Sequence, residues 1–154
     1  AYAREHPEHG IIAAEVHVPG VATLMEKAER EGLDNVRTFR GDALEYLIEC
    51  VGRDQLEAVH LFFPDPWPKA RHHRRRFVTP EHLVPLYRVM APGAEFRVAT
   101  DIPDYMRQTL EEVPKAGFTL VAEGPKAWDD WHSTRYEQKA LREGRAPHYA
   151  TFRW

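Results

Sequence analysis

The sequence predicts an α/β fold with a mostly parallel β-sheet that helices cover on both faces. Short apolar runs alternate along the chain with amphipathic segments of helical period, which is typical of strand–helix–strand units. The apolar runs are continuous, as expected of strands buried on both faces. In such a sheet ligands bind at the carboxyl ends of the strands, so the residues that follow each strand are the first candidates for a functional site.

The elements follow from the apolar pattern and from the residues that bound it. Six apolar runs are expected to form strands, at residues 11–16, 36–40, 58–63, 95–100, 118–123 and 148–154. Four segments of helical period are expected to form helices, at residues 19–31, 43–51, 79–90 and 104–113. Pro19 begins the first helix and Gly32 ends it, while Thr79 and Pro80 form a typical capped start for the third. The polar segment 124–145 carries three aromatic residues and is expected to be a long functional excursion.

The composition fits one globular domain, which we expect to span residues 1–154. Cys50 is the only cysteine and lies in an apolar helical stretch, where we expect it to be buried. No apolar run is long enough to cross a bilayer and no signal peptide is recognised, which predicts a cytoplasmic protein. The histidines show no zinc-binding spacing, so no metal is expected. The sequence leaves monomer and homodimer open.

The most informative segment reads Leu-Phe-Phe-Pro-Asp-Pro-Trp-Pro-Lys from Leu61 to Lys69. Each proline fixes its own φ angle and biases the preceding residue toward extended backbone, so Asp65 and Trp67 are held on a stiff loop at a strand end. A fixed carboxylate and a large aromatic ring suit the binding of a flat, polar ring such as a base. Trp67 either stacks on a base or packs the loop, and packing is the simpler interpretation.

Positive charge gathers directly after this loop, although the formal net charge of the chain is −3. Residues 69–76 read Lys-Ala-Arg-His-His-Arg-Arg-Arg. We expect four of these side chains to contact the phosphates of an RNA backbone, namely Arg71, Arg74, Arg75 and Arg76. A solvated surface is the alternative for the basic run taken alone. The combination of strand, rigid loop and basic run favours a nucleic-acid substrate.

Three acidic residues follow strands of the predicted sheet. Glu15 ends the first strand, Asp42 follows the second, and Asp101 follows the strand over residues 95–100. A carboxylate in the position of Glu15 commonly accepts hydrogen bonds from the two hydroxyls of a cofactor ribose. Asp42 can reach the adenine edge or cap the helix after it, and capping is the simpler interpretation; Asp101 has the same two alternatives. The acids fit NAD as well as S-adenosylmethionine. The Pro-Asp-Pro-Trp-Pro loop separates the two, because hydride transfer has no use for it.

The chain opens with Ala-Tyr-Ala-Arg-Glu, which reads as the tail of a helix. A cofactor-binding sheet of this type normally begins with a strand and a glycine-rich turn before that helix. We therefore expect the domain to be incomplete at its N-terminus, with the first strand and the glycine-rich turn missing.

Five blocks occur in order along essentially the whole chain. They are Glu15-Val16-His17-Val18-Pro19-Gly20-Val21, Gly41-Asp42-Ala43, Phe62-Phe63-Pro64-Asp65-Pro66-Trp67-Pro68-Lys69 with Arg71-His72-His73, Ala99-Thr100-Asp101, and Thr134-Arg135-Tyr136-Glu137. Together they resemble the bacterial tRNA (guanine-N(7)-)-methyltransferases. The third block is highly specific, whereas the Glu-x-His and Gly-Asp blocks are individually weak. That family usually has lysine where Arg135 stands and phenylalanine where Tyr136 stands.

The resemblance implies a Rossmann-like class I methyltransferase fold with S-adenosylmethionine as methyl donor. It implies methylation of a guanosine at position 46, in the variable loop of tRNA. It assigns Glu15, Asp42 and Asp65 to the cofactor site, and Asp65 also to catalysis. It assigns contacts with tRNA to Lys69, Asp101, Thr134, Arg135, Tyr136 and Glu137.

Two other functions are weighed against this one. The first is a non-catalytic RNA-binding module derived from a methyltransferase fold, which the missing glycine-rich turn favours and the retained acids disfavour. The second is a small-molecule enzyme that uses a dinucleotide, which has no use for the arginine run.

Overall fold

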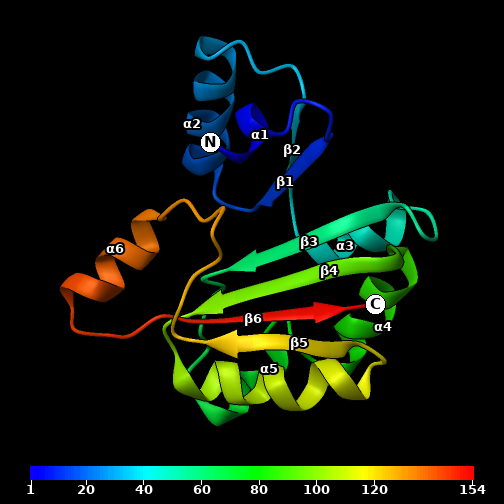
Figure 1. The fold of residues 1–154 in the computed structure, drawn as a ribbon, viewed down its shortest axis with the longest axis vertical. Coiled ribbons are helices and arrows are strands. Elements are labelled where there is room, and N and C mark those ends of the chain that lie inside the picture. Colours follow the sequence, from blue (N-terminus) through cyan, green and yellow to red (C-terminus); the bar gives the residue numbers. More distant parts are fainter. The chain divides into compact units, whose positions relative to one another are not determined.

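The structure, a computed structural model, describes all of residues 1–154 as two compact units, residues 1–51 and residues 52–154. Figure 1 shows the helices and strands of each unit, which are described separately below. No helix combines the length and the apolar character needed to cross a membrane. The single-domain organisation stays a prediction.

The first unit is built on a pair of parallel strands. Its elements are α1 (Tyr2–Glu5), β1 (Ile11–Glu15), α2 (Val18–Arg30), β2 (Val36–Arg40) and α3 (Ala43–Glu49). The pairing runs from Ile11 opposite Val36 to Glu15 opposite Arg40, and α2 contacts both strands. Gly32 follows α2 with a φ of 64°, a left-handed conformation that suits glycine after a helix. The expected helix over 19–31 is therefore confirmed to within one residue at each end.

One expectation about this unit is wrong. Cys50 follows α3, where the chain leaves the helix, and the residue is exposed. Only Leu47 of α3 is buried, because a short helix presents one face to its neighbours and Cys50 lies outside that face.

The second unit contains a four-stranded sheet in the order β3-β4-β6-β5 (Figure 1). Its elements are β3 (Leu56–Phe62), the 3₁₀ turn η1 (Ala70–Arg75), α4 (Pro80–Val89), β4 (Met90–Thr100), α5 (Pro103–Lys115), β5 (Thr119–Gly124), α6 (Arg135–Arg142) and β6 (His148–Arg153). β3 and β4 are parallel, and β6 runs antiparallel to both β4 and β5. The predicted start of α4 is confirmed, since the Thr79 hydroxyl accepts a hydrogen bond from the His82 amide.

The two faces of this sheet are covered differently. On one face, Phe96 of β4 pairs with Phe152 of β6, both side chains are fully buried, and α5 packs against the sheet. The alternate residues face the other way, because neighbouring side chains of a strand point to opposite faces. On that second face, Thr151 of β6 meets Trp128, which comes from the polar segment between β5 and α6. The excursion expected from the sequence is thus packed onto the sheet.

Candidate active site

The loop that carries Asp65 begins at the carboxyl end of β3. The Phe63 amide donates a hydrogen bond of 2.8 Å to the Ala99 carbonyl, so the pairing with β4 continues to the edge of the loop. Phe63 and Trp67 have φ angles of 48° and 40°, which is rare for aromatic residues. Backbone strain of this kind gathers at functional sites. The Asp65 side chain between these two residues is exposed and open to a ligand.

Trp67 packs onto the basic turn η1 that follows. The Arg75 guanidinium lies over the indole ring, 5.0 Å from its centroid. The His72 ring meets the indole edge-on, with 5.9 Å between ring centroids. These contacts favour the simpler interpretation of Trp67, in which the indole packs the loop.

The basic run divides into exposed and buried parts. Four side chains of the run are exposed, namely those of Lys69, Arg71, Arg74 and Arg75. Arg76 is only 1% exposed, and its guanidinium donates hydrogen bonds to Pro66, Asp104 and Gln108 of its own chain. The expected contact between Arg76 and a phosphate is therefore wrong, because the guanidinium is enclosed.

Asp101 stands after β4 as Asp65 stands after β3. Phe62 pairs with Ala99 in the parallel β3–β4 register, so the two acids follow the same edge of the sheet. The Asp101 carboxylate accepts a hydrogen bond of 2.5 Å from Nε of Arg145 through Oδ2. Only 13% of the Asp101 side chain is exposed. Arg145, which precedes β6, was not singled out from the sequence.

The block Thr134–Glu137 begins helix α6. The Thr134 hydroxyl accepts a hydrogen bond of 3.1 Å from the Glu137 amide, which caps the helix. Arg135 and Tyr136 are exposed, and the Tyr136 residue is 68% exposed. Of the four residues, these two present their side chains to solvent.

Glu137 is buried and bonded to aromatic residues of its own chain. Oε2 accepts a hydrogen bond of 2.9 Å from Trp131 Nε1, and Oε1 accepts one from the Tyr149 hydroxyl. Burial acts to raise the pKa of the Glu137 carboxyl, but hydrogen bonds from Ser133, Tyr149 and Trp131 outweigh it and leave the pKa below its usual value. Both oxygens thus accept hydrogen bonds within the chain, which gives Glu137 a structural role, and the contact with tRNA expected of it stays a prediction.

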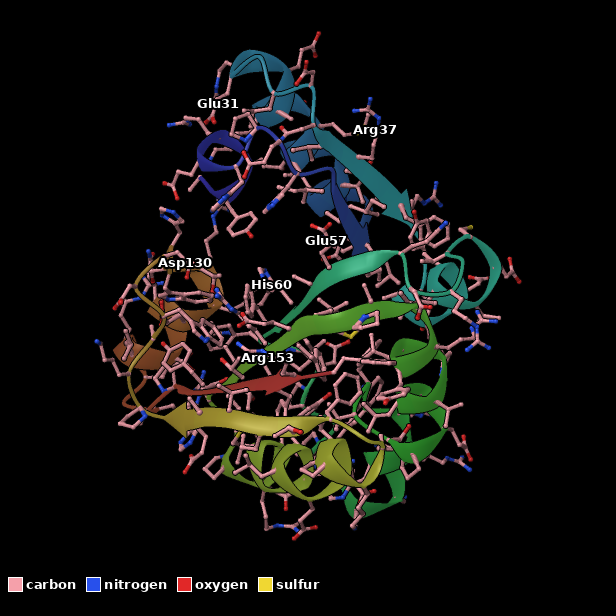
Figure 2. The ribbon with its side chains drawn as sticks, turned by 45° about the vertical axis from the view of Figure 1, so that its right-hand side comes forward. Glu31, Arg37, Glu57, His60, Asp130 and Arg153 are labelled. Atoms are coloured by element: carbon pink, nitrogen blue, oxygen red, sulfur yellow. The ribbon has the colours of Figure 1, made fainter.

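The segment before α6 is held to the sheet by further polar contacts. Trp128 Nε1 donates a hydrogen bond of 2.7 Å to the Thr151 hydroxyl, and the Arg97 guanidinium lies 5.2 Å from the centroid of the Trp128 ring. Nη1 of Arg97 also donates to both oxygens of Asp130, at 2.9 and 3.0 Å. Figure 2 shows Asp130 on this segment and His60 on β3. Phe62 closes the cluster, with its ring edge-on to Trp131.

Glu15 and Asp42 lie at one edge of the first unit. Glu15 is the last residue of β1, and its carbonyl accepts a hydrogen bond from the amide of Gly41, which precedes Asp42. Oε1 of Glu15 accepts a hydrogen bond of 2.9 Å from the His17 amide. Asp42 caps α3 by accepting a hydrogen bond of 2.7 Å from the Leu44 amide, as the simpler interpretation held. Both acids are exposed.

A cluster of possible metal ligands occurs in the same unit. Donor atoms of His6, Glu8 and His9 all lie within 4.8 Å of one another. Oε1 of Glu8 is 3.4 Å from His6 Nδ1 and 3.6 Å from His9 Nε2, which are ion-pair distances. Pairing of the carboxylate with the imidazoles accounts for the cluster, and the expected absence of a metal stays a prediction.

Sequence reasoning did not single out Arg145, and it named Arg76 and Glu137 for contacts with RNA without finding the bonds that they make within the chain. The spacing of Thr134 and Glu137 is a capping-box signature and could have located the start of α6. No local signal distinguishes Arg76 from Arg75, because burial depends on where α5 packs.

A family model described as "Putative methyltransferase" matches residues 1–150 of the chain. The chain belongs to this methyltransferase family. A protein of Paracoccus denitrificans (strain Pd 1222) named tRNA (guanine-N(7)-)-methyltransferase is 66% identical over 151 residues, which are 98% of this chain and 64% of the relative. A protein of Ruegeria sp. (strain TM1040) with the same name is 62% identical over 97% of this chain and 60% of its own length. The chain thus spans about six-tenths of the length of these relatives.

Solved structures agree on the fold. The 16S rRNA methyltransferase KamB matches with a TM-score of 0.74 at 18% identity, covering 99% of this chain and 80% of that chain. A SAM-dependent methyltransferase from Aquifex aeolicus matches with a TM-score of 0.61 at 13% identity, covering 92% of this chain and 67% of that chain. The Rossmann-like methyltransferase fold expected from the sequence is confirmed.

Proposed function

We propose that this protein transfers a methyl group from S-adenosylmethionine to N7 of a guanosine in tRNA, at position 46 of the variable loop. The observation that carries the proposal is 66% identity, over 98% of the chain, to a protein named tRNA (guanine-N(7)-)-methyltransferase. The exposed Asp65 beside an exposed basic turn supports it independently, because a carboxylate and phosphate-binding cations are what this reaction requires of the protein.

The residues of the first unit fit the proposed methyl donor. Glu15 and Asp42 are exposed at the carboxyl edge of β1 and β2, where carboxylates bind ribose hydroxyls in folds of this type. The His17 amide bonds one oxygen of Glu15, which orients the carboxylate and leaves the other oxygen for a ligand. S-adenosylmethionine supplies an electrophilic methyl group attached to a sulfonium.

The chemistry at guanine needs positioning more than proton transfer. N7 carries a lone pair and no proton, so it forms its bond to the methyl carbon as the carbon–sulfur bond breaks, and no general base is required at N7. The guanine ring gains the positive charge that the sulfonium loses. Protein groups therefore contribute by aligning the ring and by stabilising this charge.

Asp65 is the residue proposed to do this. Its exposed carboxylate, on a loop fixed by prolines and by strained φ angles at Phe63 and Trp67, can accept hydrogen bonds from guanine N1–H and from the 2-amino group. Adenine lacks this pair of donors, so the contact also selects guanine. Asp101 follows the neighbouring strand and keeps one carboxylate oxygen that Arg145 does not bond.

The tRNA is proposed to bind through two groups of side chains. The phosphates contact the exposed cations of the basic run over residues 69–76, namely Lys69, Arg71, Arg74 and Arg75. The start of α6 contributes Thr134, Arg135 and Tyr136, of which Tyr136 is the most exposed aromatic side chain of the chain.

The test is transfer of labelled methyl to unmodified tRNA by the full-length protein, with tRNA binding measured in parallel. The matched control is Asp65→Asn, which keeps the shape of the side chain and removes its charge. Label on tRNA with the wild type and not with the control supports the proposal. Binding of tRNA without transfer would favour the non-catalytic RNA-binding module instead. Absence of tRNA binding would refute both.

A further inference from the structure

The loop over Pro64–Pro68 has few means of attaching itself to the rest of the protein. Pro64, Pro66 and Pro68 have no N–H group, so the loop is stiff but poor in backbone donors. Attachment of the loop to the rest of the protein therefore depends on its carbonyl oxygens, which can accept hydrogen bonds from side chains elsewhere in the chain. Two residues of the basic run, His73 and Arg76, stand at these carbonyl oxygens.

Arg76 is the principal donor. Its Nε donates a hydrogen bond of 2.9 Å to the Pro66 carbonyl, which lies between Asp65 and Trp67. His73 Nε2 stands 3.4 Å from the Pro68 carbonyl on the other side of Trp67. Both ends of the Trp67 turn are thereby tied to the chain segment that carries Arg76.

The other end of the Arg76 guanidinium is fixed to helix α5. Nη1 donates to Oδ2 of Asp104 at 2.9 Å and to Oε1 of Gln108 at 2.8 Å. The guanidinium also lies over the Tyr105 ring, 4.9 Å from its centroid. Gln108 is held in turn by its own hydrogen bond of 2.6 Å to the Val78 carbonyl. A planar fork with donors on both sides is required here, and an ammonium group cannot reproduce it.

We propose that Arg76 is a positioning residue, whose buried guanidinium fastens the Pro64–Pro68 loop to helix α5 and so fixes the Asp65 carboxylate for methyl transfer. This inference rests on the proposed function for its catalytic consequence. It does not give Arg76 any contact with tRNA. The neighbouring Arg75 differs from Arg76, because its side chain is exposed over Trp67 and is proposed to contact a phosphate.

The test compares Arg76→Lys with Arg107→Lys in the full-length protein. Arg107 bonds the same Asp104 carboxylate, through Oδ1 at 2.7 Å, but it is exposed and has no contact with the loop. Arg76→Lys is expected to lower kcat for tRNA methylation by roughly 10- to 100-fold, the effect of a misplacement of about 1 Å. The KM for tRNA and its salt dependence should stay unchanged, because no phosphate contact is lost. Arg107→Lys should change none of these quantities.

A second readout does not depend on activity. In protein labelled with 5-fluorotryptophan, the ¹⁹F signal of Trp67 is assigned by its loss in Trp67→Phe. Arg76→Lys should shift or broaden the Trp67 signal and leave those of Trp128, Trp131 and Trp154 in place, while Arg107→Lys moves none. Asp104→Asn weakens the same attachment by removing the charge that Arg76 bonds, and it should move the Trp67 signal less than Arg76→Lys does. It replaces Arg76→Lys in this test if that variant does not fold.

The outcomes separate the two proposals. An unmoved Trp67 signal in Arg76→Lys would overturn the attachment, and a moved signal with normal kcat would overturn its catalytic role. A raised KM with a reduced salt slope would make Arg76 an RNA contact and also refute the inference. Failure of the wild type to methylate tRNA would refute the proposed function, while the ¹⁹F signals would still decide whether Arg76 holds the loop.

Discussion

Two irregular segments of residues 52–154 carry much of the proposed site, and each is held in place by one buried ionised side chain. Arg76 holds the loop with Asp65, and Glu137 holds the segment with Trp128 and Trp131. Arg76 meets an opposite charge, since Asp104 is its partner and 44% of the Asp104 side chain is exposed. Glu137 has neutral partners, the Trp131 N–H and the Tyr149 O–H.

The difference shows two ways to keep a charge inside a protein. A buried charge is tolerated when it is paired or when several dipoles satisfy it. The Arg76 arrangement can recruit water through the exposed Asp104, so loss of its carboxylate partner is partly compensated. The Glu137 carboxylate is bonded by neutral donors and meets no opposite charge, so its stability contribution depends on the charge state of one carboxyl group.

The largest effect is expected at Asp65, which lies on the Pro64–Pro68 loop with its side chain exposed. Asp65→Asn should lower kcat for methyl transfer about 100- to 1,000-fold, because a preorganised electrostatic contact in the transition state is lost. Its free energy of unfolding should change by no more than about 0.5 kcal/mol, as for an exposed side chain. Steady-state kinetics and urea unfolding measure the two quantities. Normal turnover would remove Asp65 from the mechanism.

Glu137→Gln tests the second segment. An amide can accept a hydrogen bond from Trp131 or from Tyr149 but presents N–H groups to the other, so one buried donor loses its acceptor. The free energy of unfolding should fall by about 1–3 kcal/mol. Asp104→Asn, the matched change at the first segment, should cost less, about 1 kcal/mol or under. Urea unfolding measures both losses. A larger loss in Asp104→Asn than in Glu137→Gln would contradict the proposed difference between the two buried charges.

The stabilities of the wild type and of Glu137→Gln should also depend differently on pH. The pKa of Glu137 is below its usual value of 4.5 in the folded protein, so its contribution to stability is fully present above pH 4.5. That contribution is lost as the pH falls through the lower folded pKa. The stability gap between wild type and Glu137→Gln should therefore narrow as the pH is lowered below 4.5. A gap that widens in acid would mean that burial dominates and that the pKa is raised.

The smallest effect is expected at a single exposed cation of the basic turn. Arg71→Gln should lower tRNA affinity modestly and reduce the slope of log K against log[salt] by about 0.7–0.9, the value for one phosphate contact. Arg107→Gln, an exposed arginine on α5 outside the basic turn, is the control and should leave the slope unchanged. An equal reduction in both variants would indicate a general charge effect and no defined contact.

Local signals in the sequence were enough for most elements and for the exposed part of the site. Pro19 with Gly32 and Thr79 with Pro80 marked helix ends correctly, because caps act within a few residues. Asp65 was found because three prolines restrict its loop directly. The burial of Arg76 and Glu137 was not predictable, since each depends on residues about 10 to 30 positions away that only the folded chain brings near. The exposure of Cys50 was missed because an apolar helical stretch does not show which of its residues lies outside the buried face.

The identity of the methylated nucleoside tests the central claim most directly. Unmodified tRNA is incubated with the full-length protein and S-adenosylmethionine, digested to nucleosides and analysed by mass spectrometry against standards. The account predicts 7-methylguanosine, formed about 100- to 1,000-fold more slowly when Asp65→Asn replaces the wild type. A different methylated nucleoside, such as one modified on N1 or on the 2-amino group, would contradict it, because Asp65 is proposed to bind those positions and leave N7 free to react.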